Sequence, residues 1–275
     1  MSRGRTDPLV EISDLHFAYD GEPVFRGLTL AIPRGKLVAI LGGSGSGKST
    51  LLRLIGGELA PERGWIRVDG ELVHKLEARA LYRLRRRLGM MFQASGLFTD
   101  LDVYENVAFP LREHYALPEE LLRPLVLMKL HAVGLRGACD LMPADLSGGM
   151  TRRVALARAI ATDPMLVMYD EPFAGLDPIT LNVVATLVRR LNDALGATSI
   201  VVTYDVSEAL NVVDRLYVIA DGRLAGEGTP AELLASEDPY LRQFLHALPD
   251  GPVRFHAPAP PLARSLGLAL RPGAG

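Results

Sequence analysis

The stretch Gly42-Gly43-Ser44-Gly45-Ser46-Gly47-Lys48-Ser49-Thr50 follows the apolar run Leu37 to Leu41 and precedes a segment of helical character. It matches the pattern G-x-x-x-x-G-K-[ST] in full. Its glycines let backbone N–H groups turn inward around phosphates, and the start of the following helix adds partial positive charge there. A glycine-rich turn in a fold that binds no nucleotide is the alternative, and the strand-loop-helix context argues against it.

Candidate catalytic side chains lie in this loop and at the end of a later strand. In such a loop Lys48 reaches the β- and γ-phosphates of a nucleotide, and Ser49 is a ligand of Mg²⁺. The apolar run Met165 to Tyr169 ends in Asp170 and Glu171, and open α/β sheets bind ligands at the carboxyl ends of their strands. We expect Asp170 to hold Mg²⁺, directly or through water, and Glu171 to orient and polarise the attacking water. An acidic strand end that only caps the next helix is the alternative.

Composition sets further limits. The chain has 275 residues, of which 48% are apolar, enough for one substantial domain with a large core. The net charge of −2 gives no sign of a general affinity for nucleic acid or for an anionic bilayer. The single cysteine, Cys139, rules out a disulfide within the chain and fits a reducing cytosol. We find neither a run of about 20 apolar residues nor a secretory signal, so action at a membrane would need another polypeptide.

Strands alternate with helices along most of the chain, which predicts a mostly parallel sheet covered by helices on both faces. We expect strands at Leu9–Tyr19, Leu28–Ile32, Leu37–Leu41, Trp65–Gly70 with its turn, Met165–Tyr169, Thr198–Thr203 and Leu216–Ile219. We expect helices at about Gly47–Leu54, Glu77–Leu88, Gly148–Ala161 and Ile179–Leu195. Residues 96–145 form a predicted helical insertion, with periodicity interrupted at Pro110, Pro118 and Pro124. Pro, Ala and Gly dominate 248–275, which predicts an extended tail.

A third motif narrows the class. Leu146-Ser147-Gly148-Gly149-Met150 resembles the signature of ABC ATPases, and the resemblance covers Leu9 to about Ala235. It implies an α/β P-loop NTPase (RecA-like) core with an N-terminal antiparallel β-subdomain and an inserted helical subdomain, at about 96–145. The ABC ATPase domain would span 1–247, with the tail after it. In this family Ser147, Gly148 and Gly149 serve the γ-phosphate on the partner subunit's ATP, which implies a homodimer that sandwiches two ATP molecules.

The resemblance implies roles for other residues. Tyr19 looks like the aromatic residue that stacks on adenine, with an ordinary strand aromatic as the alternative. Gln93 matches the Q-loop glutamine, which contacts the metal and the attacking water and joins the core to the helical subdomain. Ala174-Gly175-Leu176-Asp177 resembles the D-loop of the dimer interface. The arginines at 83, 85, 86 and 87 are interpreted as a solvated helix face rather than a nucleic-acid site.

Three positions depart from the family pattern. Met150 stands where many members have Gln, and Gly175 replaces the commoner small residue of the D-loop. Tyr204 stands where the family has the switch histidine that touches the γ-phosphate. Since a tyrosine hydroxyl is neutral near pH 7, we expect Tyr204 to donate a hydrogen bond in catalysis beside Glu171, Lys48 and Gln93, and hydrolysis to be slower than in relatives that keep the histidine.

The segment from Leu97 to His114 resembles importer-like cassettes, and three other segments resemble the ATPases of Mla phospholipid-transport systems: Met168–Pro178, Arg242–Leu245 and Asp250–His256. This implies a place on the cytoplasmic face of the bacterial inner membrane, held there by an MlaE-type permease. It further implies a periplasmic MCE-domain lipid-binding protein and often a STAS-domain subunit.

Several expectations stay open after this comparison. Met91, Phe98 and Tyr104 are candidates for a groove that takes a permease helix, with core packing as the alternative. The tail, anchored by Phe255, either docks on a neighbouring subunit or stays solvated. Alternatives for the whole chain are a small-solute importer ATPase, a non-transport cassette for translation or DNA repair, and a weakly hydrolysing nucleotide-gated scaffold. Lipid specificity and transport direction do not follow from the sequence.

Overall fold

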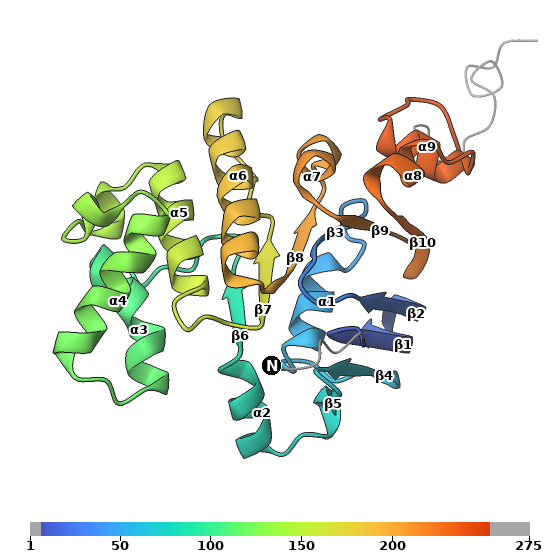
Figure 1. The fold of residues 1–275 in the computed structure, drawn as a ribbon. Coiled ribbons are helices and arrows are strands. Elements are labelled where there is room, and N and C mark those ends of the chain that lie inside the picture. The colour runs from blue at the N-terminus through green and yellow to red at the C-terminus, as the bar shows by residue number, and fades with distance from the viewer. Residues whose placement is uncertain (1–6, 254–275) are drawn as a thin grey trace, which may run out of the picture.

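The computed structural model describes residues 7–253, and two sheets form the middle of that part (Figure 1). The smaller sheet is antiparallel, with the order β2-β1-β4-β5. Its strands are β1 (Val10–Tyr19), β2 (Glu22–Ile32), β4 (Arg63–Val68) and β5 (Glu71–Leu72). Strand β2 begins at Glu22, six residues before the predicted start at Leu28, because its first half pairs with the end of β1 despite its polar exposed residues.

The larger sheet carries the strands that position the predicted phosphate site. Its order is β10-β9-β3-β8-β7-β6, with β10 antiparallel to β9 and the other neighbours parallel. The strands are β3 (Leu37–Leu41), β6 (Leu88–Met91), β7 (Leu166–Asp170), β8 (Thr198–Thr203), β9 (Arg215–Ala220) and β10 (Arg223–Gly228). Every residue of β3, β7 and β8 is buried, as expected of parallel strands covered on both faces.

The apolar core lies on both faces of this sheet. Since side chains alternate along a strand, Val38 and Ile40 of β3 pack with the antiparallel sheet and α1 (Lys48–Ile55). On the opposite face, Ala39 and Leu41 pack with α7 (Val206–Val212), α8 (Pro230–Leu234) and α9 (Pro239–Leu245). The long helix α6 (Pro178–Leu195) covers the same face over β7 and β8.

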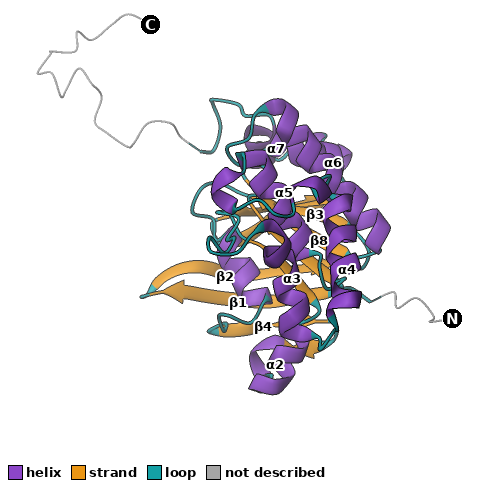
Figure 2. Cartoon of the chain, turned by 90° about the vertical axis from the view of Figure 1, so that its left-hand side faces the viewer, coloured by secondary structure: helices purple, strands orange, loops and turns teal. Residues whose placement is uncertain are grey.

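A helical group lies beside the sheet at the β6 edge (Figure 1). It contains α3 (Val103–His114), α4 (Glu119–Ala132) and two short 3-10 turns, Arg136–Ala138 and Pro143–Asp145. These helices share a core with α5 (Gly148–Ala159), and Figure 2 shows them in front of the strands.

Two predicted helix interruptions are wrong, because Pro110 lies inside α3 and Pro124 inside α4. Burial of Val107 and Val126 on the inner face of these helices outweighs the one backbone hydrogen bond that each proline removes. Pro118 does mark a boundary, because it is the N-cap of α4.

The helix in the arginine-rich segment is shorter than predicted. Helix α2 (Ala78–Arg85) ends before the predicted Leu88, which begins β6 instead. Arg83, Arg85 and Arg87 are exposed, as the interpretation of a solvated face expects. Arg85 Nε also donates to the Gly56 carbonyl at 3.0 Å, and Arg87 pairs with Asp69, so these two side chains link their segment to its neighbours at the surface.

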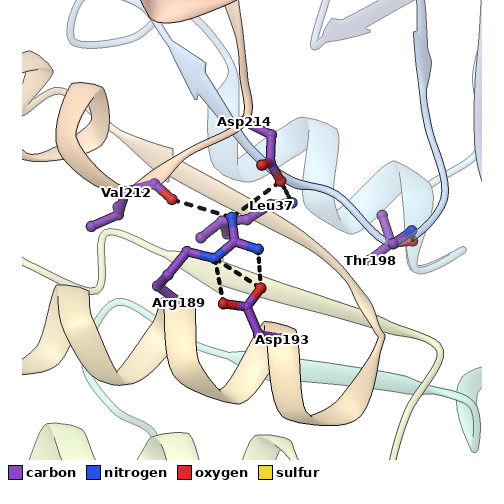
Figure 3. Close-up of polar contacts among 7 residues, drawn as sticks. Leu37, Arg189, Asp193, Thr198, Val212 and Asp214 are labelled. Carbon is purple, nitrogen blue, oxygen red and sulfur yellow. Dashed lines mark hydrogen bonds and ion pairs between the residues drawn. The ribbon is translucent and has the colours of Figure 1, made fainter.

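Arg189 of α6 joins the amino ends of β3 and β9 through Asp214 (Figure 3). Its Nη1 donates to Asp214 Oδ2 at 3.1 Å, and its Nε donates to Asp193 Oδ1 at 3.0 Å. The same oxygen of Asp214 accepts a hydrogen bond from the Leu37 backbone N–H at 2.8 Å. Gly35 N–H donates to Thr198 Oγ1 at 2.9 Å beside it. Helix α6 is therefore fixed at the edge of the sheet opposite the phosphate loop. Among residues 7–253, no helix has the length and apolarity to span a membrane.

Candidate functional site

The predicted site residues from both motifs meet at the carboxyl end of the parallel sheet, around a cavity of about 400 Å³. The residues that line it are Tyr19, Val24, Ser44, Gly45, Ser46, Gly47, Lys48, Ser49, Thr50, Gln93, Glu171 and Tyr204. They come from the β1–β2 hairpin, the phosphate loop, the segment after β6, and the ends of β7 and β8. Parallel strands place their carboxyl ends at one edge, which is why residues so distant in sequence converge here.

The phosphate loop adopts the conformation that its glycines allow. Gly45 and Gly47 have φ angles of 77° and 88°, in the left-handed region that favours glycine. A Cβ on Gly47 would lie 2.4 Å from Val24 Cγ1, so the loop also packs tightly against the hairpin. Gly47 is the N-cap of α1 and places no side chain over the first turn. The N–H groups of that turn are thus available to an anion.

Lys48 lies folded against its own loop. Its Nζ donates to the carbonyls of Gly42 at 2.8 Å and Gly43 at 3.2 Å. Burial lowers the pKa of the Lys48 ammonium, while the nearby carboxylates of Glu171 and Asp170 act in the opposite direction. Gly42 and Gly43 do not line the cavity, but their carbonyls hold the ammonium at its floor.

Ser49 and Asp170 place two oxygen donors side by side. Ser49 Oγ donates to Asp170 Oδ1 at 2.9 Å, which joins the start of α1 to the end of β7. Burial raises the pKa of Asp170, and the hydrogen bond from Ser49 opposes that rise. A hydroxyl and a carboxylate are the hard oxygen donors that Mg²⁺ prefers, usually together with phosphate oxygens and water. The donor set therefore fits the predicted metal, although the described residues contain no cluster of three or more His, Cys, Asp or Glu side chains.

Glu171 is buried and has a strained backbone. Its φ is 47°, which is unusual for a residue other than glycine, yet its N–H donates to the Val202 carbonyl at 2.9 Å. Such conformations cost about 1–3 kcal/mol and gather at functional sites. Burial raises the pKa of the Glu171 carboxyl, which accepts a hydrogen bond from the Tyr204 N–H at 3.4 Å. A carboxyl group with a raised pKa that lines the same cavity as the phosphate loop fits the predicted role in polarising water.

Three predicted residues form the more open side of the cavity. Tyr19 is 39% exposed, meets the Phe17 ring edge-on, and its hydroxyl accepts a hydrogen bond from Arg53 Nη1 at 3.2 Å. Gln93 is exposed, and Tyr204 is 57% exposed at the end of β8. Their side chains therefore have the freedom to reach a ligand.

The signature residues lie elsewhere. Among the described residues around the cavity, none belongs to 146–150. Ser147 is the N-cap of α5, and its Oγ accepts a hydrogen bond from the Met150 N–H at 3.3 Å. A Cβ on Gly149 would meet Thr180 Cγ2 at 2.5 Å, so this glycine is required for contact with α6. The two phosphate-binding motifs of one chain do not share one cavity.

Two arginines of α5 were not predicted as site residues. Arg152 donates through Nη1 to the Gln93 carbonyl and through Nη2 to the Ala174 carbonyl at 3.2 Å. Arg158 donates to the Ser95 carbonyl at 2.9 Å. The helix that begins at the signature thus holds the Gln93 segment and the predicted D-loop in place. Both arginines contact backbone carbonyls of residues distant in sequence. Since any residue type offers such a carbonyl, the sequence gives no sign of these contacts.

Gly175 of the predicted D-loop has a φ of 74°, so a residue with a side chain there would be strained. This backbone conformation explains why glycine stands at this position.

The predicted groove for a permease helix needs correction. Met91 is fully buried and Tyr104 is only 8% exposed, with its hydroxyl donating to Glu119 Oε1 at 2.7 Å. Both belong to the core and cannot line an open groove. Phe98, which is 38% exposed, is the groove candidate that remains.

Residues 25–174 match the ABC transporter family. The chain belongs to this family. The match spans the phosphate loop, the signature and Glu171, and the ABC ATPase fold is confirmed by solved structures. One is described as the dimeric structure of a post-hydrolysis state of the ATP-binding cassette MJ0796 bound to ADP and Pi. It is 32% identical, has a TM-score of 0.73, and covers 80% of this chain and 98% of its own. This ABC ATPase therefore binds and hydrolyses ATP.

Curated relatives extend the similarity far beyond the family match. The intermembrane phospholipid transport system ATP-binding protein MlaF of Haemophilus influenzae is 53% identical over 94% of this chain and 98% of its own length. The protein of the same name from Escherichia coli K12 is 51% identical over 91% of this chain and 93% of its own. The predicted resemblance is confirmed over almost the whole chain.

Proposed function

We propose that this ABC ATPase drives phospholipid transport between the inner and outer membranes, as the ATP-hydrolysing subunit of an Mla-type system. The observation that carries this proposal is the 53% identity over 94% of the chain to a protein named for that transport. An ATPase of a small-solute importer has weaker support, because a relative named for probable ribonucleotide transport is only 38% identical over 89% of the chain.

The cavity supports a division of roles in phosphoryl transfer. The N–H groups around Gly45 and Gly47 and the ammonium of Lys48 would face the phosphates, where charge spreads over oxygens in the transition state. Ser49 and Asp170 would hold Mg²⁺ together with phosphate oxygens, and the metal would neutralise charge there. Glu171 would accept the proton of the attacking water. Its raised pKa brings this base closer to working pH.

The signature supports a homodimer in which each cavity is completed by the other copy. Ser147, Gly148 and Gly149 stand at the start of α5, outside the cavity of their own chain. A solved relative with similar architecture is described as dimeric. Two chains placed head to tail would bring each signature to the γ-phosphate on the partner subunit's ATP, and ATP would favour that closed pair.

We further propose the partners that the Mla relationship implies. An MlaE-type permease would hold the chain at the cytoplasmic face of the inner membrane, a periplasmic MCE-domain protein would carry lipid, and a STAS-domain subunit would complete the complex. The exposed pair Phe98 and Phe109, with ring centroids 4.5 Å apart, offers an apolar surface on the helical group for a permease helix. Arg158 stacks over Phe98 and also holds the Ser95 carbonyl, which would link such docking to the Gln93 segment.

ATP turnover by the purified chain, with and without co-expressed membrane partners, tests this proposal. We expect turnover to rise with the partners and to vanish in a Glu171→Gln control that still binds ATP. Reconstitution of the complex in vesicles with labelled phospholipid would then show ATP-dependent lipid movement. A complex that hydrolyses ATP and moves a small solute instead would refute the lipid assignment.

A nucleotide-gated scaffold is the second candidate, and Tyr204 favours it. Tyr204, at the end of β8, is 57% exposed and stands where the family has a histidine. Turnover that is weak in the isolated chain and does not rise in the complex, while ATP still binds, would support a weakly hydrolysing scaffold and contradict a transport motor.

A further inference from the structure

The last described segment, Asp250–Val253, is fastened to α9 by a single side chain. Gln243 Nε2 donates to the Val253 carbonyl at 2.8 Å, and the Val253 N–H donates to Gln243 Oε1 at 2.8 Å. Gln243 is 8% exposed. A buried amide whose donor and acceptor are both satisfied by one residue fixes the path of the chain at that point.

The segment is also shaped to fit this amide. A Cβ on Gly251 would lie 2.5 Å from Gln243 Cδ, so a side chain at this position would force either the segment or the Gln243 amide to move. Leu241 and Leu245, on either side of Gln243 in α9, are buried in the core beside β9. The two hydrogen bonds between Gln243 and Val253, which we call the clamp, therefore fix the segment Asp250–Val253 to the buried helix α9. We name this segment the strap.

The strap and the phosphate loop line the same cavity. This cavity has a volume of about 610 Å³, and its lining includes Gly43 to Ser46 as well as Pro252 and Val253. It shares five lining residues with the nucleotide cavity: Tyr19, Val24, Ser44, Gly45 and Ser46. The two cavities are neighbours along the same loop.

The shared and unshared residues tell which end of a nucleotide the strap would face. Lys48, Ser49 and Glu171 line only the first cavity, so the phosphates belong there. Tyr19 lines both, and it is the residue placed to meet the base. The second cavity adds the carboxylates of Glu22 and Asp221.

Carboxylates repel phosphate and accept hydrogen bonds from hydroxyl or amino groups. Arg26 and Tyr240 complete the polar part of this lining. The composition of the second cavity therefore suits the sugar and base of a nucleotide better than its phosphates.

We infer that the strap is an outer wall of the nucleotide site on its adenosine side, and that Gln243 is the residue that positions it. The inference rests on the nucleotide binding described above and adds a specificity element to it. Gln243 acts through the strap and is a positioning residue.

Calorimetric titration of the full chain with ADP and with pyrophosphate separates the two ends of the ligand. Gln243→Leu removes both hydrogen bonds at similar size, and Gly251→Ala displaces the strap while Gln243 remains. We expect each to weaken ADP binding by about threefold to tenfold, the scale for lost contacts along one edge of a ligand. Pyrophosphate binding should be unchanged, and the double variant should be no weaker than either single one. Arg242→Gln, an exposed neighbour on α9, is the matched control and should bind both ligands normally.

Unchanged ADP affinity in both variants overturns the inference, and so does an equal loss for ADP and pyrophosphate, which would mean that the phosphate loop itself was disturbed. Melting temperatures are measured alongside, and Gly251→Ala alone decides the matter if Gln243→Leu fails to fold. An unmodified chain that binds neither ligand would instead contradict the nucleotide site as a whole.

Discussion

Arg152→Met should lower ATP turnover, because Arg152 holds the Gln93 segment and the predicted D-loop in position. In the structure the guanidinium holds the carbonyls of Gln93 and Ala174, the latter at 3.2 Å. Hydrogen bonds to charged groups contribute about 1.5–3 kcal/mol each. Arg152 is partly exposed, so we take a combined loss of about 2 kcal/mol in the transition state, or about 30-fold in kcat. The apparent affinity for ATP should change little, because Arg152 does not line the cavity.

The adjacent Arg153 provides the matched control. It lies on the same helix but donates to the Val133 carbonyl at 3.2 Å, inside the helical group. Steady-state turnover of the assembled complex should therefore fall for Arg152→Met and stay within about threefold of the unmodified protein for Arg153→Met, because the Val133 carbonyl belongs to neither of the loops that Arg152 holds. If Arg152→Met keeps full kcat with an unchanged melting temperature, the bridge has no part in catalysis.

Changes at Tyr204, Glu171 and Arg189 test other parts of the structure. Tyr204→His should raise kcat by about fivefold, because a hydrogen bond from a charged donor stabilises by about 1 kcal/mol more than one from a neutral donor. Unchanged turnover would count against the idea that tyrosine slows hydrolysis. Burial raises the pKa of Glu171 above its ordinary 4.5, and the base must be ionised to act. As the pH decreases, kcat should therefore begin to fall at a higher pH than it would with an exposed glutamate. A flat acid limb in the pH–kcat profile would contradict this. Arg189→Met should lower the free energy of unfolding by about 2 kcal/mol, because it leaves Asp214 and the Val212 carbonyl with fewer hydrogen-bond donors. Denaturant titration measures this change, and Arg190→Met on the same helix is the control.

The cavity could be predicted from the sequence because its parts are local motifs. Each motif contains its own strand end, loop and helix start, so Lys48, Asp170 and Glu171 carry their geometry in their neighbours. The convergence of these motifs then follows from the parallel sheet. The assignment of catalytic roles to these residues stays a prediction, as do the domain boundaries at 96, 145 and 247.

What could not be predicted depends on contacts between distant residues or on short elements. Arg152 and Gln93 are 59 positions apart, and their contact uses a backbone carbonyl that any residue would offer. Strand β6 has four residues and follows a helix directly, so its apolar run gave no separate signal. The predicted anchor Phe255 lies outside the described residues, whereas the clamp between Gln243 and Val253 arises from a glycine and an amide that have no characteristic pattern.

The separation of Ser147 from Lys48 bears on the genetics of this protein. If each catalytic centre draws one motif from each of two copies, a defect in the phosphate loop and a defect in the signature can occupy the same centre when they come from different copies. A cell that expresses one chain with Lys48→Ala and another with Ser147→Arg would then form mixed pairs with one doubly damaged centre and one intact centre. Two alleles that are each inactive alone would complement each other, and the degree of complementation would report how many intact centres a working pair needs.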